Sequence, residues 1–362
     1  MKITFDQFNR QKNLHEQRKL YAHCFPESHL SAEESEAHYQ WQFASFPHLH
    51  QGSASYEYAA FDNDEMVGYY AALPYRYNIE GVLCTCGMVC DVMTHPQKRG
   101  QGIFKQLGMF ATEDLKRAQL HFTSGYPIRK DVMPGHLSVG WKVGFKLPMF
   151  VSFLASRAML QKIHLSLVAP FADALLIFFN ALLSFYWRKK IPFYDVESRE
   201  ASETSLQSLL PFIALWEKEQ NFFLIKDFEF LRWRLGKKNA HYKIFFLQKS
   251  DDIVGAALVR YTNFYGIPAA VILDCMVLRD HLQASPRMFS EIKKAAFQDR
   301  CEAVVVMMSG HWGKRYQLRK AGFLRSPYVF QFISKKLNYS MEEKNFLDEK
   351  NWHLMWIDSD RF

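Results

Sequence analysis

The sequence predicts an α/β protein with two mixed-sheet domains joined by an apolar helical segment. Three observations lead to this prediction: the chain has 362 residues, the order hairpin, strand, helix, strand occurs twice, and one long apolar run separates the two copies. A single compact core rarely extends over so many residues, so two domains are expected. We expect domains over 1–150 and 196–340, a helical linker over 151–195, and a C-terminal extension over 341–362.

The first domain is predicted to begin its sheet with a β-hairpin. Residues 56–61 and 66–73 are rich in β-forming side chains, and the polar turn Asp62-Asn63-Asp64-Glu65 separates them. A helix is expected over 102–119, because its apolar residues recur at intervals of three and four. Further strands are expected at 75–79, 81–86, 87–94 and 121–124.

The second domain repeats this order of elements. Helices are expected at 206–220, 228–235 and 286–299, and strands at 242–249, 253–261, 269–277 and 303–308. The turn Ser250-Asp251-Asp252 makes a hairpin of the first two strands. Few residues are identical between the two halves, so we interpret the repetition as a structural duplication.

The helix expected over residues 169–187 is almost wholly apolar. Its polar exceptions, together with those just outside it, are spaced by four or seven residues and so share one stripe: Lys162, Ser166, Asp173, Asn180, Ser184 and Arg188. Three alternatives remain open. The helix is buried between the domains, lies in a membrane interface with help from Arg188-Lys189-Lys190, or spans a bilayer, which would place Asp173 in hydrocarbon.

Composition narrows the class of partner and the compartment. The net charge of +8 suits a polyanionic partner, but the basic residues are scattered, so nucleic acid is not expected. The six cysteines lack the spacing of a zinc site, and we expect them to be buried and reduced, with no metal. The first residues, Met1 to Asp6, have no apolar core typical of a signal peptide. We therefore expect a cytoplasmic protein, with membrane association through 169–187 as the open alternative.

One loop carries the pattern of a phosphate site. A strand ending near Thr94 leads into Gln97-Lys98-Arg99-Gly100-Gln101-Gly102-Ile103, and a helix follows at once. Two glycines let the backbone approach a ligand closely, and the unpaired amides at the start of the helix point toward it. These amides and the helix dipole favour a pyrophosphate, and Lys98 and Arg99 add charge-assisted contacts.

These residues resemble a known family. Residues 89–107 look like the coenzyme A motif of the GNAT N-acetyltransferase superfamily, Q/R-x-x-G-x-G/A, with Gln97, Gly100 and Gly102 on its defining positions. The segment 91–96 is similar to that family's fourth strand, and 136–141 resembles its Tyr-x-x-x-Gly-Phe step. The layout, with Phe230-Leu231-Arg232-Trp233-Arg234 and the closing residues 352–362, resembles two-domain members often met beside bacterial cell-surface polysaccharide genes.

The resemblance implies an N-acetyltransferase with acetyl-CoA as donor and two GNAT-like domains. Backbone amides of 99–103, which include Gln101 and Ile103, would hold the pyrophosphate. Backbone groups of Val92, Met93 and Thr94 would bind the pantetheine arm and polarise the thioester carbonyl. The acceptor implied is a primary amine on a small molecule such as an amino sugar.

The acid and base of the reaction stay open in the sequence. His136 stands where the family commonly has the tyrosine that protonates the departing thiolate, and Tyr126 is its rival. An amine must lose a proton before it attacks, and Asp91 on the motif strand is the first candidate for the base. His95 and Asp131 are the alternatives.

Two further functions remain open beside direct acyl transfer. One is a non-catalytic module that binds coenzyme A, and the other is a membrane-surface transferase with a lipid-linked acceptor. In the second half, residues 279–286 contain no glycine, and Asp280 would repel a phosphate. We therefore expect a degenerate copy there that supports the first domain, shapes the acceptor pocket or mediates homodimer formation.

Overall fold

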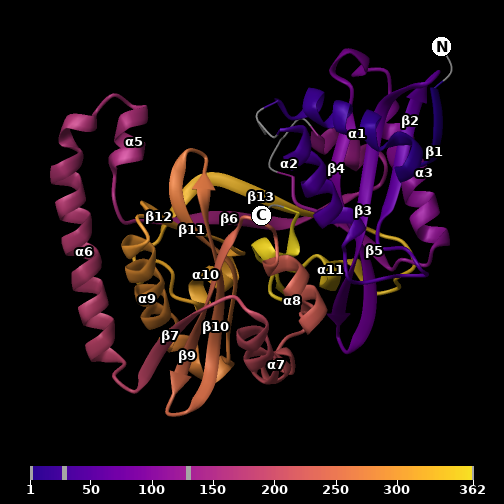
Figure 1. Cartoon of the computed structure of the whole chain (residues 1–362). Helices are drawn as coiled ribbons and strands as arrows, with labels where there is room; N and C mark the ends of the chain where they lie inside the picture. Colours follow the sequence, from indigo (N-terminus) through magenta and orange to yellow (C-terminus); the bar gives the residue numbers. More distant parts are fainter. Residues whose placement is uncertain (1–2, 27–30, 128–131, 361–362) are drawn as a thin grey trace. The chain divides into compact units, whose positions relative to one another are not determined.

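The computed structural model describes residues 3–26, 31–127 and 132–360. The chain divides into two compact units, each built around a mixed β-sheet with helices packed on it (Figure 1). Unit 1 comprises Met1–Phe145 and Gln331–Asp348, and unit 2 comprises Lys146–Phe330 and Glu349–Phe362. The predicted mixed α/β class is confirmed.

Unit 1 has a sheet whose first four strands run antiparallel. Its strands are β1 (Ile3–Gln7), β2 (Tyr56–Asp62), β3 (Glu65–Ile79), β4 (Val82–Thr94) and β5 (Phe122–Gly125). Its helices are α1 (Arg10–Cys24), α2 (Ala32–Tyr39), η2 (Gln40–Ala44), η3 (Pro96–Lys98), α3 (Ile103–Arg117), α4 (Met133–Ser138) and α11 (Glu343–Phe346). Because β5 pairs parallel to β4, the chain crosses over between them through α3.

The hairpin of β3 and β4 is longer than the sequence predicts. Two short strands were expected on each side, divided at Pro74 and near Cys86, whereas each side is one continuous strand. Pro74 lies opposite Gly87 inside the ladder. The strands are joined by Glu80 and Gly81, which have φ values of +52° and +84°. Two left-handed residues make the tight turn that fits the twist of a hairpin.

The core of unit 1 lies between α3 and one face of the sheet. The helix turns its buried residues Ile103, Leu107, Ala111 and Leu115 toward the sheet, as their three-to-four spacing predicts. Aromatic and small side chains of β2 and β3 meet them, among them Tyr58. This packing holds the start of α3 against the end of β4, where the candidate site lies.

Two long strands, β6 (Lys142–Phe153) and β13 (Leu324–Lys336), contain the points where the chain passes between the units. Within unit 1, Ile333–Lys336 of β13 pair with Phe122–Gly125 of β5. Residues 331–348 therefore belong to unit 1, whereas the sequence assigned 331–340 to the second domain and 341–348 to an extension. The pairing joins residues some two hundred positions apart, and local periodicity carries no signal of such a partner.

Unit 2 has the strand order β6-β12-β11-β10-β9-β7. Its other strands are β7 (Tyr194–Glu200), β8 (Phe222–Leu224), β9 (His241–Lys249), β10 (Asp252–Phe264), β11 (Ile267–Val277), β12 (Ala303–Met307) and β14 (Trp352–His353). Its helices are α5 (Arg157–Lys162), η5 (Ser166–Val168), α6 (Ala169–Lys190), α7 (Glu203–Glu217), α8 (Phe228–Leu235), η6 (Arg279–Ala284), α9 (Ser285–Gln298), α10 (Gly310–Arg315) and η7 (Trp356–Asp358).

The predicted duplication appears in the strand topology of the two units. In unit 1, β4 leads through α3 to the parallel strand β5, and in unit 2, β11 leads through α9 to the parallel strand β12. Each of these crossovers follows an antiparallel hairpin, β3–β4 or β10–β11. The two units thus share one arrangement of hairpin, strand, helix and strand.

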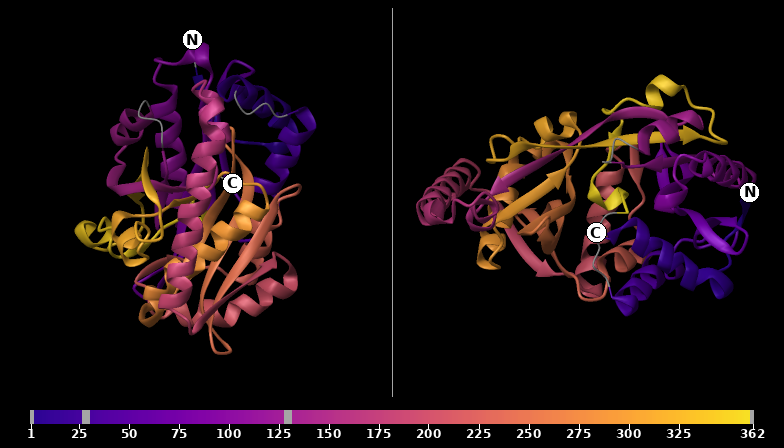
Figure 2. Two further views of the ribbon diagram at one scale, coloured as in Figure 1. Left: turned by 90° about the vertical axis from the view of Figure 1, so that its left-hand side faces the viewer. Right: turned by 90° about the horizontal axis from the view of Figure 1, so that it is seen from above.

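The apolar helix α6 lies at the border of unit 2 beside α9 (Figure 1), and it is not buried. Its most apolar window has a mean hydropathy of 1.9, and 6% of that window is buried. By length and composition alone it could cross a membrane. A view turned by 90° shows α6 uncovered along its length in front of unit 2 (Figure 2). The alternative of a buried linker helix is therefore wrong.

Candidate functional site

The loop between β4 and α3 has the backbone of an anion cradle. Gly100 and Gly102 adopt φ values of +79° and +77°, a region that glycine occupies without steric cost. A Cβ at Gly100 would meet no atom within 4 Å, so the loop faces open space there. Gly102 is the N-cap of α3, and no side chain caps that helix. The first amides of α3 are therefore left to bind a ligand.

A β-bulge shapes the end of β4. The register with β3 shifts between Tyr69, opposite Met93, and Ala71, opposite Cys90, so β4 contains one extra residue there. Asp91 lies in this bulge with φ of +47°. A bulge bends its strand and redirects the side chains that follow it. Val92 and Met93 consequently reach the cavity described below.

The two parallel strands of unit 1 separate next to this bulge. Their described pairing extends from Cys86 opposite Phe122 to Met88 opposite Ser124. Beyond Met88, β4 continues to Thr94, while β5 ends at Gly125. The edge of β4 that faces β5 thus offers backbone groups to an extended ligand, in the way that a sheet edge accepts an added strand.

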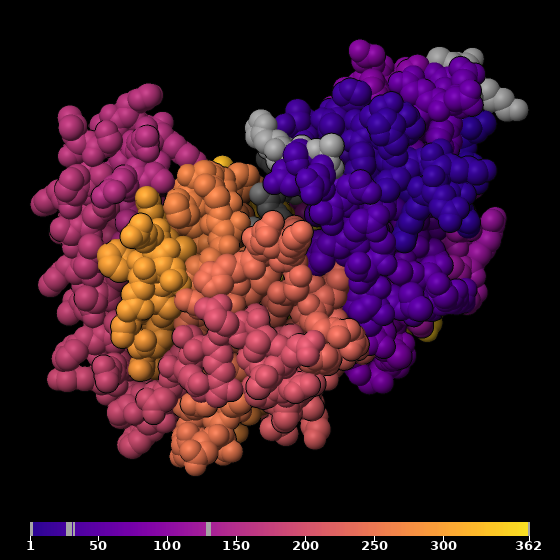
Figure 3. Space-filling model, in the orientation of Figure 1, coloured from indigo at the N-terminus to yellow at the C-terminus, as the bar shows by residue number. Residues whose placement is uncertain are grey.

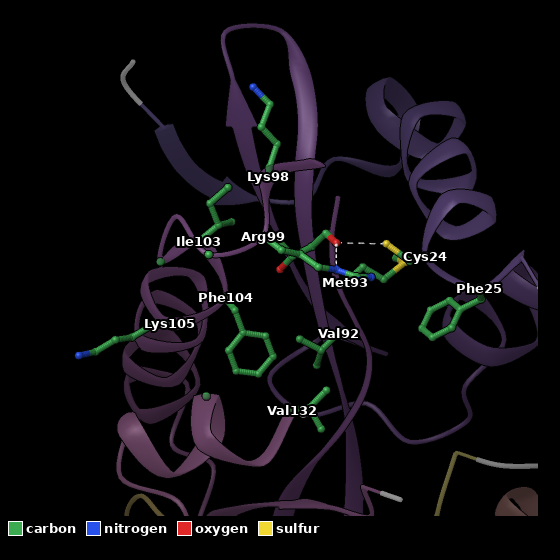
Figure 4. A pocket seen from close by; sticks show the side chains of 14 residues that line it. Cys24, Phe25, Val92, Met93, Lys98, Arg99, Ile103, Phe104, Lys105 and Val132 are labelled. Atoms are coloured by element: carbon green, nitrogen blue, oxygen red, sulfur yellow. Dashed lines mark hydrogen bonds between the residues drawn. The ribbon is translucent and has the colours of Figure 1, made fainter. Parts of the chain in front are cut away.

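A cavity of about 350 Å³ lies where the loop, the end of β4 and the start of α3 meet (Figure 4). Parts of α1, β4, α3 and α4 line it. The described lining residues are Cys24, Phe25, Val92, Met93, Thr94, Lys98, Arg99, Gly100, Gly102, Ile103, Phe104, Lys105, Val132 and Gly135. One end is basic and rich in open backbone, and the other is apolar, which suits a ligand with phosphates at one end and an uncharged arm at the other.

The basic side chains at the cavity differ in their hydrogen-bond partners. Nζ of Lys98 lies 2.7 Å from Oδ2 of Asp62, and this hydrogen bond raises the pKa of Lys98. Nε of Arg99 donates to the carbonyl of Thr94 at 3.4 Å, and Sγ of Cys24 donates to the same oxygen at 3.5 Å, as Figure 4 shows. The exposed Lys105 on the first turn of α3 is a cation that sequence reasoning missed.

The family model described as Acetyltransferase (GNAT) domain matches residues 9–144, which include the loop, the bulge and every described residue of the cavity. Residues 9–144 are a GNAT acetyltransferase domain. The resemblance seen in Gln97, Gly100 and Gly102 is thereby confirmed, and the chain carries an acyltransferase domain of a family that binds acyl-CoA.

Solved structures share the fold over most of this chain. A probable N-acyltransferase from Enterococcus faecalis has a TM-score of 0.64 at 11% identity, with 93% of this chain and 73% of that chain covered. A GCN5-related N-acetyltransferase from Anabaena variabilis has a TM-score of 0.62 at 10% identity, with 93% and 73% covered. At such identities the likeness shows the fold alone.

A third similar structure is the N-myristoyltransferase of Saccharomyces cerevisiae with bound myristoyl-CoA. Its TM-score is 0.60 at 10% identity, and the match covers 95% of this chain and 83% of that chain. No curated protein matches the sequence. The fold and the domain family are thus established, whereas the acceptor has to be inferred from the site itself.

His136, the first candidate for the acid, is a buried side chain of the GNAT domain. Its ring lies between Phe104 and Trp141, at 5.0 Å from the centre of each ring. Burial lowers the pKa of His136 to about 4, so the imidazole is uncharged at neutral pH. The described lining of the cavity does not include it. Its role as acid stays a prediction, without a supporting contact.

The other sequence candidates differ in their positions. Tyr126 follows β5, has 9% of its surface exposed, and packs its ring 5.9 Å from that of Phe332, outside the described lining. Asp91 is half-buried in the bulge and directly precedes Val92 of the lining. His95 is half-buried and packs its ring 5.2 Å from that of His23. Asp131 lies outside the described residues.

Gln97 and Gln101, which belong to the motif, are both exposed beside the cavity and are not among its described lining residues. Gln97 lies in η3, the short turn that brings the chain from β4 to the glycines. Gln101 stands between the two left-handed glycines. Because the cradle is formed by backbone amides, these two residues would bind a ligand through their backbone and not through their side chains.

Sequence reasoning missed a buried carboxylate on β2, Glu57. It accepts hydrogen bonds from the hydroxyls of Tyr39 and Tyr69, both at 2.6 Å, and forms an ion pair with Arg10 at 2.7 Å. Burial of Tyr69 raises the pKa of this tyrosine, the negative charge of Glu57 raises it further, and the charge of Asp91 adds to the effect. Tyr69 therefore lies in the electrostatic field of both carboxylates. No local pattern around Glu57 in the sequence indicates this cluster.

In unit 2 the helix that corresponds to α3 begins differently. The residues before α9 form the 3₁₀ turn η6, and the buried Ser285, Pro286 and Arg287 fill the first turn of α9. The amide of Arg279 donates to Oε2 of Glu219 at 2.7 Å. The expectation that this copy binds no coenzyme A remains a prediction that these contacts favour.

All six cysteines are thiols outside any disulfide and are buried, the environment that the sequence predicts for them. Within residues 3–26, 31–127 and 132–360, no group of three or more His, Cys, Asp or Glu side chains is placed to hold a metal ion.

Proposed function

We propose that this protein is an acyl-CoA-dependent N-acyltransferase that uses acetyl-CoA and transfers the acyl group directly to a primary amine. The observation that carries the proposal is one continuous cavity that joins the glycine cradle, Gly100–Ile103, to the open edge of β4. An acyl-CoA has the matching order of parts: a pyrophosphate, an extended amide-containing arm and a thioester.

The residues of the cavity fit such a donor from end to end. Amides of Gly100 to Ile103 would hold the pyrophosphate, with Arg99 and Lys105 nearby as cations. The open backbone of Val92 to Thr94 would pair with the amides of the arm. The apolar side chains of Val92, Phe104 and Val132, which lie near one another in Figure 4, would surround the uncharged end.

The acyl-CoA supplies an activated acyl group. The chain positions the two substrates, polarises the thioester carbonyl and supplies a base. An amide at the bulge can polarise the thioester carbonyl as negative charge develops on its oxygen. The incoming amine has to lose a proton, and the carboxylate of Asp91, which directly precedes Val92 of the lining, is the first candidate for the base. Glu57 is a second carboxylate, joined to Tyr69 by a hydrogen bond of 2.6 Å, and it could accept the proton through a relay.

The acceptor that we propose is an amino sugar or another small amine, and the compartment is the cytoplasm. A second candidate function is a non-catalytic module that binds coenzyme A. It is favoured by one observation: neither His136 nor Tyr126 is among the described residues that line the cavity. Donor binding without release of free coenzyme A, over a broad panel of amines, would support that second function.

The binding step is tested by calorimetry with acetyl-CoA. Gly100→Glu should weaken binding by about a hundredfold, because it strains a left-handed position and sets a negative charge against the phosphates. Gly81→Glu is the matched control, since Gly81 has φ of +84° and equally open surroundings but lies in the distant β3–β4 turn. Equal loss of binding in both variants would contradict the proposed site.

The transfer step is tested by release of free coenzyme A with a panel of amines, including amino sugars. Because one structural relative holds myristoyl-CoA, the donors should cover short and long acyl chains. We expect the highest kcat/KM with acetyl-CoA. A preference for long-chain donors would keep the reaction class but would overturn the choice of acetyl-CoA.

A further inference from the structure

The outer face of α6 exposes a band of large apolar side chains. Three phenylalanines at intervals of seven residues mark it, with exposed fractions of 71% for Phe171, 68% for Phe178 and 58% for Phe185. Leu175 and Leu182 lie between them on the same face and are also more than half exposed. Leu167, just before the helix, is 96% exposed. Contiguous apolar surface of this kind marks an interaction site.

The two polar side chains in the apolar part of α6 with contacts to the rest of unit 2, Asp173 and Asn180, face inward, so this part of the helix turns its polar side to the protein. Oδ1 of Asp173 accepts from the amide and hydroxyl of Ser156 at 2.6 and 2.7 Å. Asn180 donates to the carbonyl of Phe153 at 3.0 Å and accepts from Nζ of Lys293 at 3.0 Å. A helix normally turns its polar stripe to water and its apolar stripe to the core.

Near the C-terminal end of α6, Trp187 is buried and its indole donates to the carbonyl of Lys320 at 3.3 Å. With Asp173 and Asn180, this gives contacts to unit 2 at three successive levels along the helix. The figures agree with this arrangement: α6 runs beside α9 in Figure 1 and stands as a ridge at the border of unit 2 in Figure 3. The helix is therefore fastened along its length with its apolar face outward.

The same end of α6 is strongly basic and aromatic. Arg188, Lys189 and Lys190 close the helix and are all exposed. Nζ of Lys190 donates to the hydroxyl of Tyr186 at 2.9 Å, and Nζ of Lys189 lies 4.8 Å from the ring centre of Phe185. The one acidic residue of the helix, Asp173, accepts a hydrogen bond from Ser156. The outward surface thus combines apolar side chains with positive charge.

We propose that α6 is a membrane-docking helix that lies in the plane of an anionic phospholipid bilayer. The phenylalanine and leucine side chains of its outer face would enter the acyl boundary, and Arg188, Lys189 and Lys190 would contact lipid phosphates. Aromatic residues such as Tyr186 are typical of the boundary between headgroups and hydrocarbon. The charge and the apolar band together favour lipid over an uncharged protein surface.

The contacts on the inner side of α6 favour docking in the plane over spanning. A spanning helix would have to leave unit 2, which would break the bonds of Asp173, Asn180 and Trp187 and place a carboxylate in hydrocarbon. A helix in the plane keeps all three. Acyl transfer by unit 1 would then take place at a membrane surface. This inference depends on α6 and does not require the proposed function.

The proposal is tested by co-sedimentation of the full chain with vesicles of equal parts phosphatidylcholine and phosphatidylglycerol, and with phosphatidylcholine alone. Wild type should bind the anionic vesicles. The triple variant Phe171→Ser, Phe178→Ser, Phe185→Ser should bind them about tenfold more weakly, because binding scales with buried apolar area. The matched control replaces three exposed apolar residues elsewhere, Met109→Ser, Leu215→Ser and Leu324→Ser, and should bind like wild type.

Charge is tested separately. Lys189→Glu with Lys190→Glu should remove the preference for phosphatidylglycerol, whereas Lys237→Glu with Lys238→Glu, an equal change of charge elsewhere in unit 2, should keep it. Raising the salt concentration should weaken wild-type binding. An unchanged circular dichroism spectrum and an unchanged thermal unfolding temperature would show that each variant is folded. If both charge variants lose the preference for phosphatidylglycerol equally, the basic end of α6 does not contact lipid phosphates as proposed.

A fluorescent probe and the oligomeric state show whether lipid or a second copy of this chain covers the outer face of α6. In Phe178→Trp, the emission of the new indole should shift to shorter wavelength when anionic vesicles are added. Sedimentation velocity without lipid should show a monomer. A wild-type dimer that the phenylalanine variant dissociates, with no vesicle binding by either, would overturn the proposal and would identify a second copy of this chain as the occupant.

Discussion

Lys98 and Asp62 form an ion pair at the rim of the phosphate loop, with 2.7 Å between Nζ and Oδ2. Asp62 is buried at the end of β2, so its carboxylate is a fixed acceptor. Lys98 is therefore oriented toward β2 before any ligand arrives. A phosphate that recruits this ammonium has to compete with Asp62, which reduces the net gain from the contact.

This competition gives a prediction for acyl-CoA affinity. In the wild-type background, Lys98→Met should weaken acetyl-CoA binding by less than about threefold. In the Asp62→Asn background, where the ammonium is released, the same change should cost about fivefold or more. Calorimetry on the four proteins completes the double-mutant cycle. Equal costs in both backgrounds would show that Asp62 does not restrain Lys98.

A second prediction separates the two carboxylates near the bulge. Asp91→Asn should lower kcat by about a hundredfold and leave the Kd for acetyl-CoA unchanged, as expected for the loss of a general base. Glu57→Gln keeps an acceptor for Tyr39 and Tyr69 and should lower kcat less. Rates are followed by release of free coenzyme A. If Glu57→Gln proves the more damaging change, the proton leaves through the Tyr69 relay instead.

Much of the fold could be predicted because its elements are locally encoded. The spacing of Ile103, Leu107, Ala111 and Leu115 predicts α3, and the structure agrees with it closely. The strands β6 and β13 were not predicted, because each is defined by a partner far away in the chain, such as Gly125 for Ile333. Their sequences carry no alternation that identifies those partners.

The site was predicted in part, for the same reason. Gly100 and Gly102 act through their own backbone, so their motif could be found from the sequence alone. Cys24 and Phe25 reach the cavity from α1, whose buried residues are few, and no motif connects them with β4. Asp62 could not be assigned as the partner of Lys98, because it appeared as one polar residue of a turn. Its role depends on tertiary packing.

A third prediction concerns pH and His136. Its folded pKa of about 4 lies below the ordinary value of 6.5, so between these two values the unfolded chain binds more protons than the folded one. The burial of the neutral ring therefore contributes its full amount to the free energy of unfolding above pH 6.5. This contribution decreases as the pH falls toward 4. At a pH below 4, the decrease in the free energy of unfolding should approach roughly 3 kcal/mol.

The change His136→Phe should remove this part of the pH dependence while it keeps the ring packing against Phe104 and Trp141. Urea unfolding of both proteins at pH 7 and pH 4.5 measures the difference. At neutral pH the variant should keep kcat within about threefold, because an uncharged, buried imidazole is a poor proton donor. A fall of a hundredfold with unchanged acetyl-CoA affinity would instead support His136 as the acid.

The last prediction concerns Gly135 of α4, where space is the constraint. A Cβ at this position would lie 2.6 Å from Cδ1 of Phe104, a ring that lines the cavity. Gly135→Ala must therefore displace Phe104, which should cost about 1–3 kcal/mol of stability and raise the KM for acetyl-CoA about tenfold. Gly310→Ala at the start of α10 is the control, since a Cβ there would meet no atom within 4 Å. It should leave both quantities nearly unchanged. An unaltered KM in Gly135→Ala would show that the Phe104 ring does not bound the donor site.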